Sequence, residues 1–238
     1  MLEKERQVSE MRTRFISVTS HEFRTPMAAA MGSVDLLINH FDRITESKRQ
    51  ELFERITSSL HRMTDMLDDV LLLNRMDSNR VPVAMTEVNL QHELRAFIDE
   101  IRLGDRDAHV FDFRVTGSVE NFVTDQNLLH HISSNLLSNA VRYSPAGSTI
   151  TVTIAGESER VTIRVSDQGI GIPEKDRSRI FEPFERGSNV GNIKGTGLGL
   201  NIVKRMTEML GGTIAAEAAQ PVGTCFTLTL PRLSQAQS

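Results

Sequence analysis

One histidine stands among residues that would let it act as a nucleophile. The chain has seven histidines, and His21 lies in the segment S-H-E-F-R-T-P. A neutral imidazole can attack phosphorus at neutral pH, and its phosphoramidate can pass the phosphate onward. Glu22 can bond to one ring nitrogen, or take its proton, while the other nitrogen attacks. Pro26 cannot donate to the Glu22 carbonyl, which predicts a loosened or bent helix just after the histidine. The alternative is structural: Ser20 caps a helix and Pro26 lies there by accident.

Thr25 follows His21 by four residues, so the two side chains are expected on one helical face. Its hydroxyl could position a water that hydrolyses a phosphorylated partner. The alternative is that the hydroxyl only bonds back to the helix backbone.

A pair of asparagines points to a cation and phosphate site. Asn135 and Asn139 are four residues apart in N-L-L-S-N-A-V-R-Y-S and share one face of a predicted helix. Asn139 is the better Mg²⁺ ligand, because an amide oxygen suits a hard cation that already carries phosphate oxygens. Arg142 can meet phosphate charge and Tyr143 can pack on a base. The alternative is that the two asparagines are ordinary polar residues exposed to solvent.

Two glycine-rich segments could approach a nucleotide closely. In D-Q-G-I-G-I-P, Asp167 ends an apolar strand and could accept a bond from an adenine amino group. Gly169 and Gly171 allow the backbone near the ring, although a single D-x-G-x-G is also a common turn.

The second segment is predicted to open a helix whose N–H groups and dipole suit phosphates. It follows a polar lid segment, residues 185–194, in which Arg186 could contact phosphate or be solvated; the same holds for Lys194. The candidate phosphate-binding residues of this segment are Lys194, Gly195, Thr196, Gly197, Leu198 and Gly199.

Taken in this order, the four segments resemble the transmitter core of sensor histidine kinases in two-component systems. The three later ones resemble that family's N, G1 and G2 boxes. The resemblance implies that ATP with Mg²⁺ phosphorylates His21, and that the phosphoryl group then moves to an aspartate of a response-regulator receiver domain. It also implies a phosphatase role for Glu22 and Thr25, a homodimer, and an upstream sensor module if the chain is a fragment.

Two helices are expected to carry the histidine. Apolar residues recur at spacings of three and four over residues 15–41 and again over residues 52–70, around a polar stretch at 42–50. Such a hairpin cannot enclose its apolar stripe alone, which favours a dimeric four-helix bundle. The alternative is that the stripe packs on the rest of the chain.

The second half is predicted to be an α/β sandwich with helices on one face of a mixed sheet. Helices are expected at 89–103, 124–143 and 196–210, the last stopped by Gly211-Gly212. Strands are expected at 109–115, 149–155, 161–166, 213–217 and 225–230. The domains are therefore residues 1–14, a helical linker; 15–78, dimerisation and phosphotransfer; and 79–238, ATP binding.

Composition limits the binding partners and the cellular compartment that are expected for this chain. A net charge of −4 does not favour nucleic acid, and no apolar run approaches the ~20 residues of a membrane helix. The single cysteine, Cys225, fits a reducing, cytoplasmic compartment and is expected to be a buried structural thiol in a strand. The segment is thus expected to be soluble, or the cytoplasmic part of a membrane-bound receptor.

Two other functions share parts of this pattern. Chaperone, gyrase and mismatch-repair ATPases use the same ATP-binding fold, but they do not account for the helix with His21. A non-catalytic signalling scaffold would keep the fold without the chemistry, yet the required groups are all present in the four segments.

Overall fold

The chain forms two compact units, Met1–Ser78 and Asn79–Ser238, in a computed structural model. The structure describes residues 2–77, 81–105, 108–191, 193 and 195–232, and within the first range it describes the side chains of residues 16–76. Each unit is described by itself.

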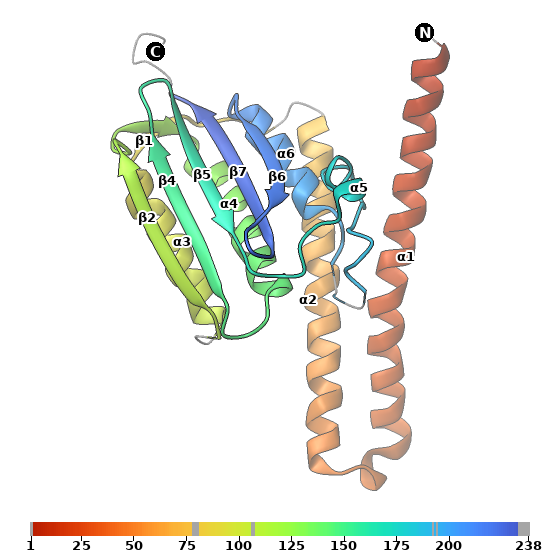
Figure 1. Ribbon diagram of the computed structural model, residues 1–238. Helices are drawn as coiled ribbons and strands as arrows, with labels where there is room; N and C mark the ends of the chain where they lie inside the picture. The colour runs from red at the N-terminus through yellow and green to blue at the C-terminus, as the bar shows by residue number, and fades with distance from the viewer. Residues whose placement is uncertain (1, 78–80, 106–107, 192, 194, 233–238) are drawn as a thin grey trace. The chain divides into compact units, whose positions relative to one another are not determined.

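The first unit is a helical hairpin (Figure 1). Helix α1 is Leu2–His40, the short 3-10 turn η1 is Phe41–Arg43, and helix α2 is Glu46–Asp77. Helix α2 begins earlier than the apolar pattern indicated. Thr45 accepts a bond from the Lys48 N–H at 3.3 Å, and Lys48 pairs with Glu51, so capping and helical ion pairs extend the helix through polar sequence.

The apolar residues of the hairpin divide into two faces. The face between the helices is closed by buried residues at alternating spacings of three and four, or at spacings of seven. These are Pro26, Ala30, Ser33 and Leu37 of α1 and Leu52, Ser59, Met66 and Leu73 of α2. A second set, here called the outer apolar face, stays exposed within the single chain. Its members are Met27, Met31, Val34, Ile38, Phe53, Leu60, Leu67 and Leu71.

The second unit contains a five-stranded mixed sheet in the order β2-β4-β5-β7-β6 (Figure 1). The strands are β2 Val110–Gly117, β4 Thr149–Gly156, β5 Arg160–Ser166, β6 Thr213–Ala218 and β7 Thr224–Pro231. Strands β2 and β4 are parallel and the other neighbours are antiparallel, so the predicted mixed sheet is confirmed.

Three helices cover one face of this sheet in Figure 1: α3 Leu90–Asp105, α4 Gln126–Tyr143 and α6 Gly199–Met209. Strand residues alternate between the core and the opposite face, as the period of two requires. In β7 the alternation buries Thr224, Phe226 and Leu228 and places Cys225, between the first two, on the other face. Cys225 is half-buried, so the expectation of a buried thiol was wrong.

Three short elements were not predicted. Strand β1, Thr86–Val88, pairs antiparallel with β3, Phe122–Thr124, and α5 is the single turn Glu174–Arg177. Thr124 belongs to β3, and Asp125 caps α4 through Oδ1, which accepts from two backbone N–H groups, so the helix begins at Gln126. Three-residue strands are too short for alternation to reveal them.

Candidate functional site

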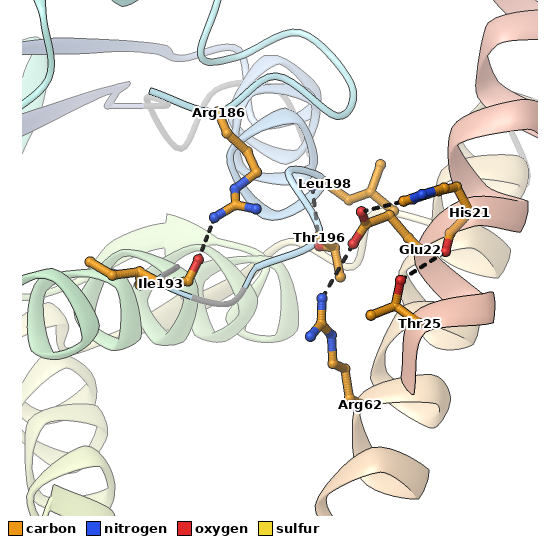
Figure 2. A network of polar contacts seen from close by, with 8 residues as sticks. All are labelled: His21, Glu22, Thr25, Arg62, Arg186, Ile193, Thr196 and Leu198. Carbon is orange, nitrogen blue, oxygen red and sulfur yellow. Dashed lines mark hydrogen bonds and ion pairs between the residues drawn. The ribbon is translucent and has the colours of Figure 1, made fainter. Parts of the chain in front are cut away.

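His21 lies in the middle of α1 with an open side chain. Its imidazole is 75% exposed, whereas the neighbouring Glu22 carboxylate is only 24% exposed. His21 Nδ1 is 3.9 Å from Glu22 Oε1 (Figure 2), which is an ion-pair distance and longer than a hydrogen bond. The carboxylate therefore faces one ring nitrogen, and the exposed ring leaves the other nitrogen accessible.

Glu22 has a second partner that the sequence did not reveal. Arg62 Nη2 of α2 donates to Glu22 Oε2 at 3.2 Å, and the arginine side chain is 25% exposed (Figure 2). The two residues are 40 positions apart, so only the register of the hairpin brings them together.

Thr25 takes the back-bonded arrangement that was the alternative for it, and Pro26 lies inside α1. The Thr25 hydroxyl donates to the His21 carbonyl at 3.4 Å, which is the back-bonded arrangement (Figure 2). Helix α1 continues through Pro26 without interruption, and Pro26 is buried. Ser20 is not a cap, because it lies within α1 and donates to the Ile16 carbonyl at 2.7 Å.

Asp167 is the buried carboxylate of the second unit. It directly follows β5 and is 5% exposed. Its Oδ1 accepts from the Gly169 N–H at 2.8 Å and from the Thr224 N–H at 3.0 Å. Burial raises the pKa of Asp167, and these two hydrogen bonds act in the opposite direction. Since both bonds end on Oδ1, Oδ2 is the oxygen that can accept from a ligand.

Close backbone contacts hold this carboxylate in place. A Cβ on Gly169 would lie 2.4 Å from the Tyr143 carbonyl oxygen, and a Cβ on Gly223 would lie 2.0 Å from that of Asp167. Gly223 also has a φ of 112°, which disfavours any side chain. Gly223 and the first residue of β7, Thr224, are therefore part of the site, although the sequence analysis missed them. The G-T pair before a strand was the available signal.

The N-terminal end of α6 lies against α4. Asn139 Nδ2 donates to Asn135 Oδ1 at 3.2 Å, and a Cβ on Gly199 would lie 2.6 Å from that same oxygen. A Cβ on Gly195 would lie 3.5 Å from the Tyr143 hydroxyl. The asparagines, Tyr143 and this glycine segment thus belong to one site.

Arg142 adds a positive charge there. Its Nη1 would lie 3.7 Å from a Cβ on Gly195, so the guanidinium is beside the glycine segment. Arg142 also stands in the last turn of α4, where it is partly directed to solvent.

Helix α6 begins at Gly199, not at Thr196 as predicted. Gly197 has a φ of 73°, which a right-handed helix cannot contain, and its carbonyl accepts from the Phe184 N–H at 2.9 Å. The Thr196 hydroxyl accepts from the Leu198 N–H at 3.2 Å (Figure 2). Gly195, Thr196 and Gly197 are therefore a loop that leads into the helix.

The lid segment is attached to its surroundings by side chains. Asn189 Nδ2 donates to the carbonyls of Ile170 at 3.1 Å and Gly171 at 3.0 Å, directly beside the Asp167 turn. Arg186 Nη2 donates to the Ile193 carbonyl (Figure 2), so its guanidinium binds the lid's own backbone. Lys194 lies outside the described residues.

The side-chain oxygens of this site suit a cation that is also bound by the phosphate groups of a ligand. Among the described residues, no group of three or more His, Cys, Asp and Glu side chains could hold a metal ion. Asn139 uses its amide nitrogen towards Asn135, which leaves its carbonyl oxygen for a cation. One amide oxygen combined with phosphate oxygens and water matches the coordination that Mg²⁺ prefers.

No helix within the described ranges is both long and apolar enough to cross a membrane.

Comparisons with known proteins place family matches on both units. Residues 124–234 match the family described as histidine kinase-, DNA gyrase B- and HSP90-like ATPase. Residues 11–79 match the His kinase A (phospho-acceptor) domain. The two matches follow one another in the order of the two units.

Individual relatives agree with these matches. The circadian input-output histidine kinase CikA of Synechococcus elongatus is 30% identical over 224 residues, which cover 91% of this chain and 29% of that protein. The sensor-like histidine kinase SenX3 of Mycobacterium tuberculosis is 32% identical over 228 residues, which cover 94% of this chain and 55% of that protein. The crystal structure of full-length ShkA in complex with AMPPNP is similar at a TM-score of 0.67 and 25% identity, covering 96% of this chain and 47% of that one.

The chain therefore spans between 29% and 55% of the length of these relatives.

Proposed function

Because this chain belongs to the sensor histidine kinases, as a transmitter core, we propose that it transfers the γ-phosphoryl group of ATP to its own His21. The observation that carries the proposal is the exposed imidazole with a carboxylate oxygen 3.9 Å from Nδ1. An exposed ring can meet a large phosphodonor, and the adjacent carboxylate can receive the proton that the reaction releases.

The nucleotide would bind in the second unit. Asp167 Oδ2 accepts from the adenine amino group, while Tyr143 packs near the base. The start of α6 and the loop at Gly195–Gly197 offer backbone N–H groups to the phosphates. Arg142 lies beside this loop and adds positive charge. The ShkA structure, which holds AMPPNP, supports a nucleotide site in a protein of similar fold.

In the proposed transfer, residues of this chain supply the nucleophile and accept the proton that is released. Nε2 of His21 attacks the γ-phosphorus, and ADP leaves with the electron pair of the bond that breaks. Once Nε2 is bonded to phosphorus, the imidazole would carry a positive charge, which Glu22 relieves by taking the proton from Nδ1. Asn139 would hold Mg²⁺, and this ion supplies neutralisation of phosphate charge. Positioning and charge neutralisation account for most of the catalysis in phosphoryl transfer of this kind.

The phosphoryl group would then pass to an aspartate of a response regulator. The histidine kinase ThkA has been crystallised in complex with the response regulator TrrA, which supports a partner of this kind. Glu22 and Thr25 would serve the reverse function, in which a water hydrolyses the phosphorylated regulator. Thr25 would have to release its bond to the His21 carbonyl to do so.

The outer apolar face supports a homodimer. Its eight residues stay exposed within one chain although they are large and apolar. A second copy would bury them in a four-helix bundle. If the chain is a fragment, residues 1–14 would receive the signal from an upstream sensor module.

The test is incubation of the chain with γ-labelled ATP and Mg²⁺. A label on His21 survives base and is lost in acid, as a phosphoramidate is. His21→Gln is expected to abolish the label while ATP affinity stays within a few-fold. An acid-labile label at wild-type level in His21→Gln would place the acceptor on another histidine.

A further inference from the structure

Glu22 lies between two cationic or potentially cationic side chains from different helices. Its Oε1 faces Nδ1 of His21 at 3.9 Å, and its Oε2 accepts from Arg62 Nη2 at 3.2 Å (Figure 2). Glu22 and Arg62 are both about three-quarters buried, whereas His21 is mostly exposed. The carboxylate therefore has one oxygen for each partner.

The ordinary explanation for Arg62 is a structural ion pair beside the face between the two helices, here called the seam of the hairpin. Glu22 and Arg62 each stand beside a position that faces the opposite helix, and such pairs help to set helix register. The antiparallel register of the two helices also identifies a control position for Arg62. Arg55 lies seven residues before Arg62 on α2, and the corresponding position on α1 is Ala29, which has no charge to offer. If Arg62 had only a structural role, replacing Arg62 and replacing Arg55 would change the stability of the hairpin by different amounts but would not change the rate of labelling differently.

The orientation of the carboxylate points to a second role. A free glutamate side chain rotates among several rotamers, and only some of them direct an oxygen to the preceding histidine. The bond to Arg62 holds Oε2, and this restricts Oε1 to the side of the imidazole. A carboxylate at Nδ1 favours the tautomer in which Nδ1 carries the proton and Nε2 carries the lone pair.

We propose that Arg62 is a positioning residue for autophosphorylation, because it holds the Glu22 carboxylate so that His21 presents Nε2 as the nucleophile. The inference rests on the proposed function of His21 and Glu22. In the reaction the Nε2–P bond forms, the bond from the γ-phosphorus to the leaving oxygen of ADP breaks, and the Nδ1 proton moves to Glu22 Oε1. Arg62 takes no part in these bond changes and acts only through Glu22.

The kinetic test compares Arg62→Ala, Arg62→Lys and the matched control Arg55→Ala in the whole chain. Arg62→Ala is expected to lower kcat for labelling by about tenfold, less than the roughly 10²–10⁴-fold that a general base contributes. KM for ATP should stay unchanged, because the nucleotide binds in the other unit. Arg62→Lys keeps a charge and should recover part of the rate, and Arg55→Ala should stay within about twofold of wild type.

A double-mutant cycle separates positioning from stability. If Arg62 acts through Glu22, Arg62→Ala has no further effect on kcat in a Glu22→Gln background. Nitrogen-15 NMR of His21 provides a readout without ATP: Arg62→Ala should shift the imidazole from the Nδ1–H towards the Nε2–H tautomer. Arg62→Lys serves both measurements if Arg62→Ala does not fold.

Equal rates in Arg62→Ala and Arg55→Ala, an additive effect in the cycle, or an unchanged tautomer would each overturn the positioning role. A wild-type chain that takes up no label on His21 would instead refute the proposed function, and the NMR result would still report on the geometry.

Discussion

At the scale of single residues, Asp167 shows two opposing demands on one carboxylate. A ligand amino group is bound best by a charged acceptor, whereas burial disfavours that charge and raises the pKa of Asp167. Two backbone N–H groups, from Gly169 and Thr224, compensate part of the cost. The proposed binding role of Asp167 would thus come at some expense of stability.

Asp167→Asn is expected to weaken nucleotide binding by roughly 5- to 150-fold, which corresponds to about 1–3 kcal/mol. The amide can keep the bonds to both backbone N–H groups but can present a donor where the adenine amino group also donates. Calorimetry with an ATP analogue measures the change. Asp112→Asn, on β2, is the control and should bind normally. Unchanged affinity in Asp167→Asn would remove this residue from the adenine site.

The raised pKa also predicts a pH dependence of stability without nucleotide. Between the ordinary pKa of an aspartate and the raised folded value, the folded state binds more protons than the unfolded state. The contribution of Asp167 to the free energy of unfolding therefore falls as pH rises through that window. Asp167→Asn lacks this term, so its melting temperature relative to wild type should rise with pH and then level off. A difference that stays constant with pH would contradict the burial argument.

At the scale of elements, the hairpin uses its apolar residues in two ways. Leu52, Met66 and Leu73 close the seam within the chain, whereas Leu60 and Leu67 stay on the outer apolar face. The sequence analysis treated these residues as a single stripe. Substitutions on the two faces should therefore have different consequences.

Leu67→Glu is expected to give helical monomers, because Leu67 is 49% exposed in one chain and a charge there opposes only the association of two copies. Ile56→Glu should instead destabilise the hairpin itself by roughly 1–3 kcal/mol, since Ile56 is half-buried within the single chain. Sedimentation reports the first effect and thermal melting by circular dichroism the second.

Ser58→Glu introduces the same charge on an exposed position of α2 and is the control for both variants. A Leu67→Glu protein that sediments as a dimer would show that the outer apolar face has another partner.

At the scale of the whole molecule, the proposed nucleophile and the proposed nucleotide site belong to different units of the chain. ATP can therefore be bound without an acceptor, and the protein must then avoid transferring the phosphoryl group to water. Asn135 bears on this point, because its amide cannot take a proton from water. It bonds instead to Asn139 and lies against Gly199.

His21→Gln is accordingly expected to bind ATP normally and to release phosphate very slowly. A coupled phosphate assay on the purified protein measures the rate. Asn135→Glu in the same background supplies a water-activating base and should raise hydrolysis, unless the altered contact with Asn139 weakens metal binding. Brisk turnover in His21→Gln alone would favour the ATPase class over the kinase.

Local patterns were sufficient to predict the main helices and strands. The spacing of apolar residues predicted both hairpin helices, and alternation predicted the five strands of the sheet. The helix expected at 89–103 is α3, and Asn89 caps it, because its Oδ1 accepts from the His92 N–H at 3.0 Å. These features depend on residues within a few positions of each other, which is the range over which period and capping act.

What the sequence determined by itself was the presence of a histidine with its carboxylate, the asparagine helix and the glycine segments, together with the fold class. Only the tertiary structure decided which apolar face closes within the chain, that Arg62 holds Glu22, and that Thr224 supports Asp167. The last two contacts join residues 40 and 57 positions apart. Pairing over such separations depends on helix register and strand order, which the local spacing of residues does not encode.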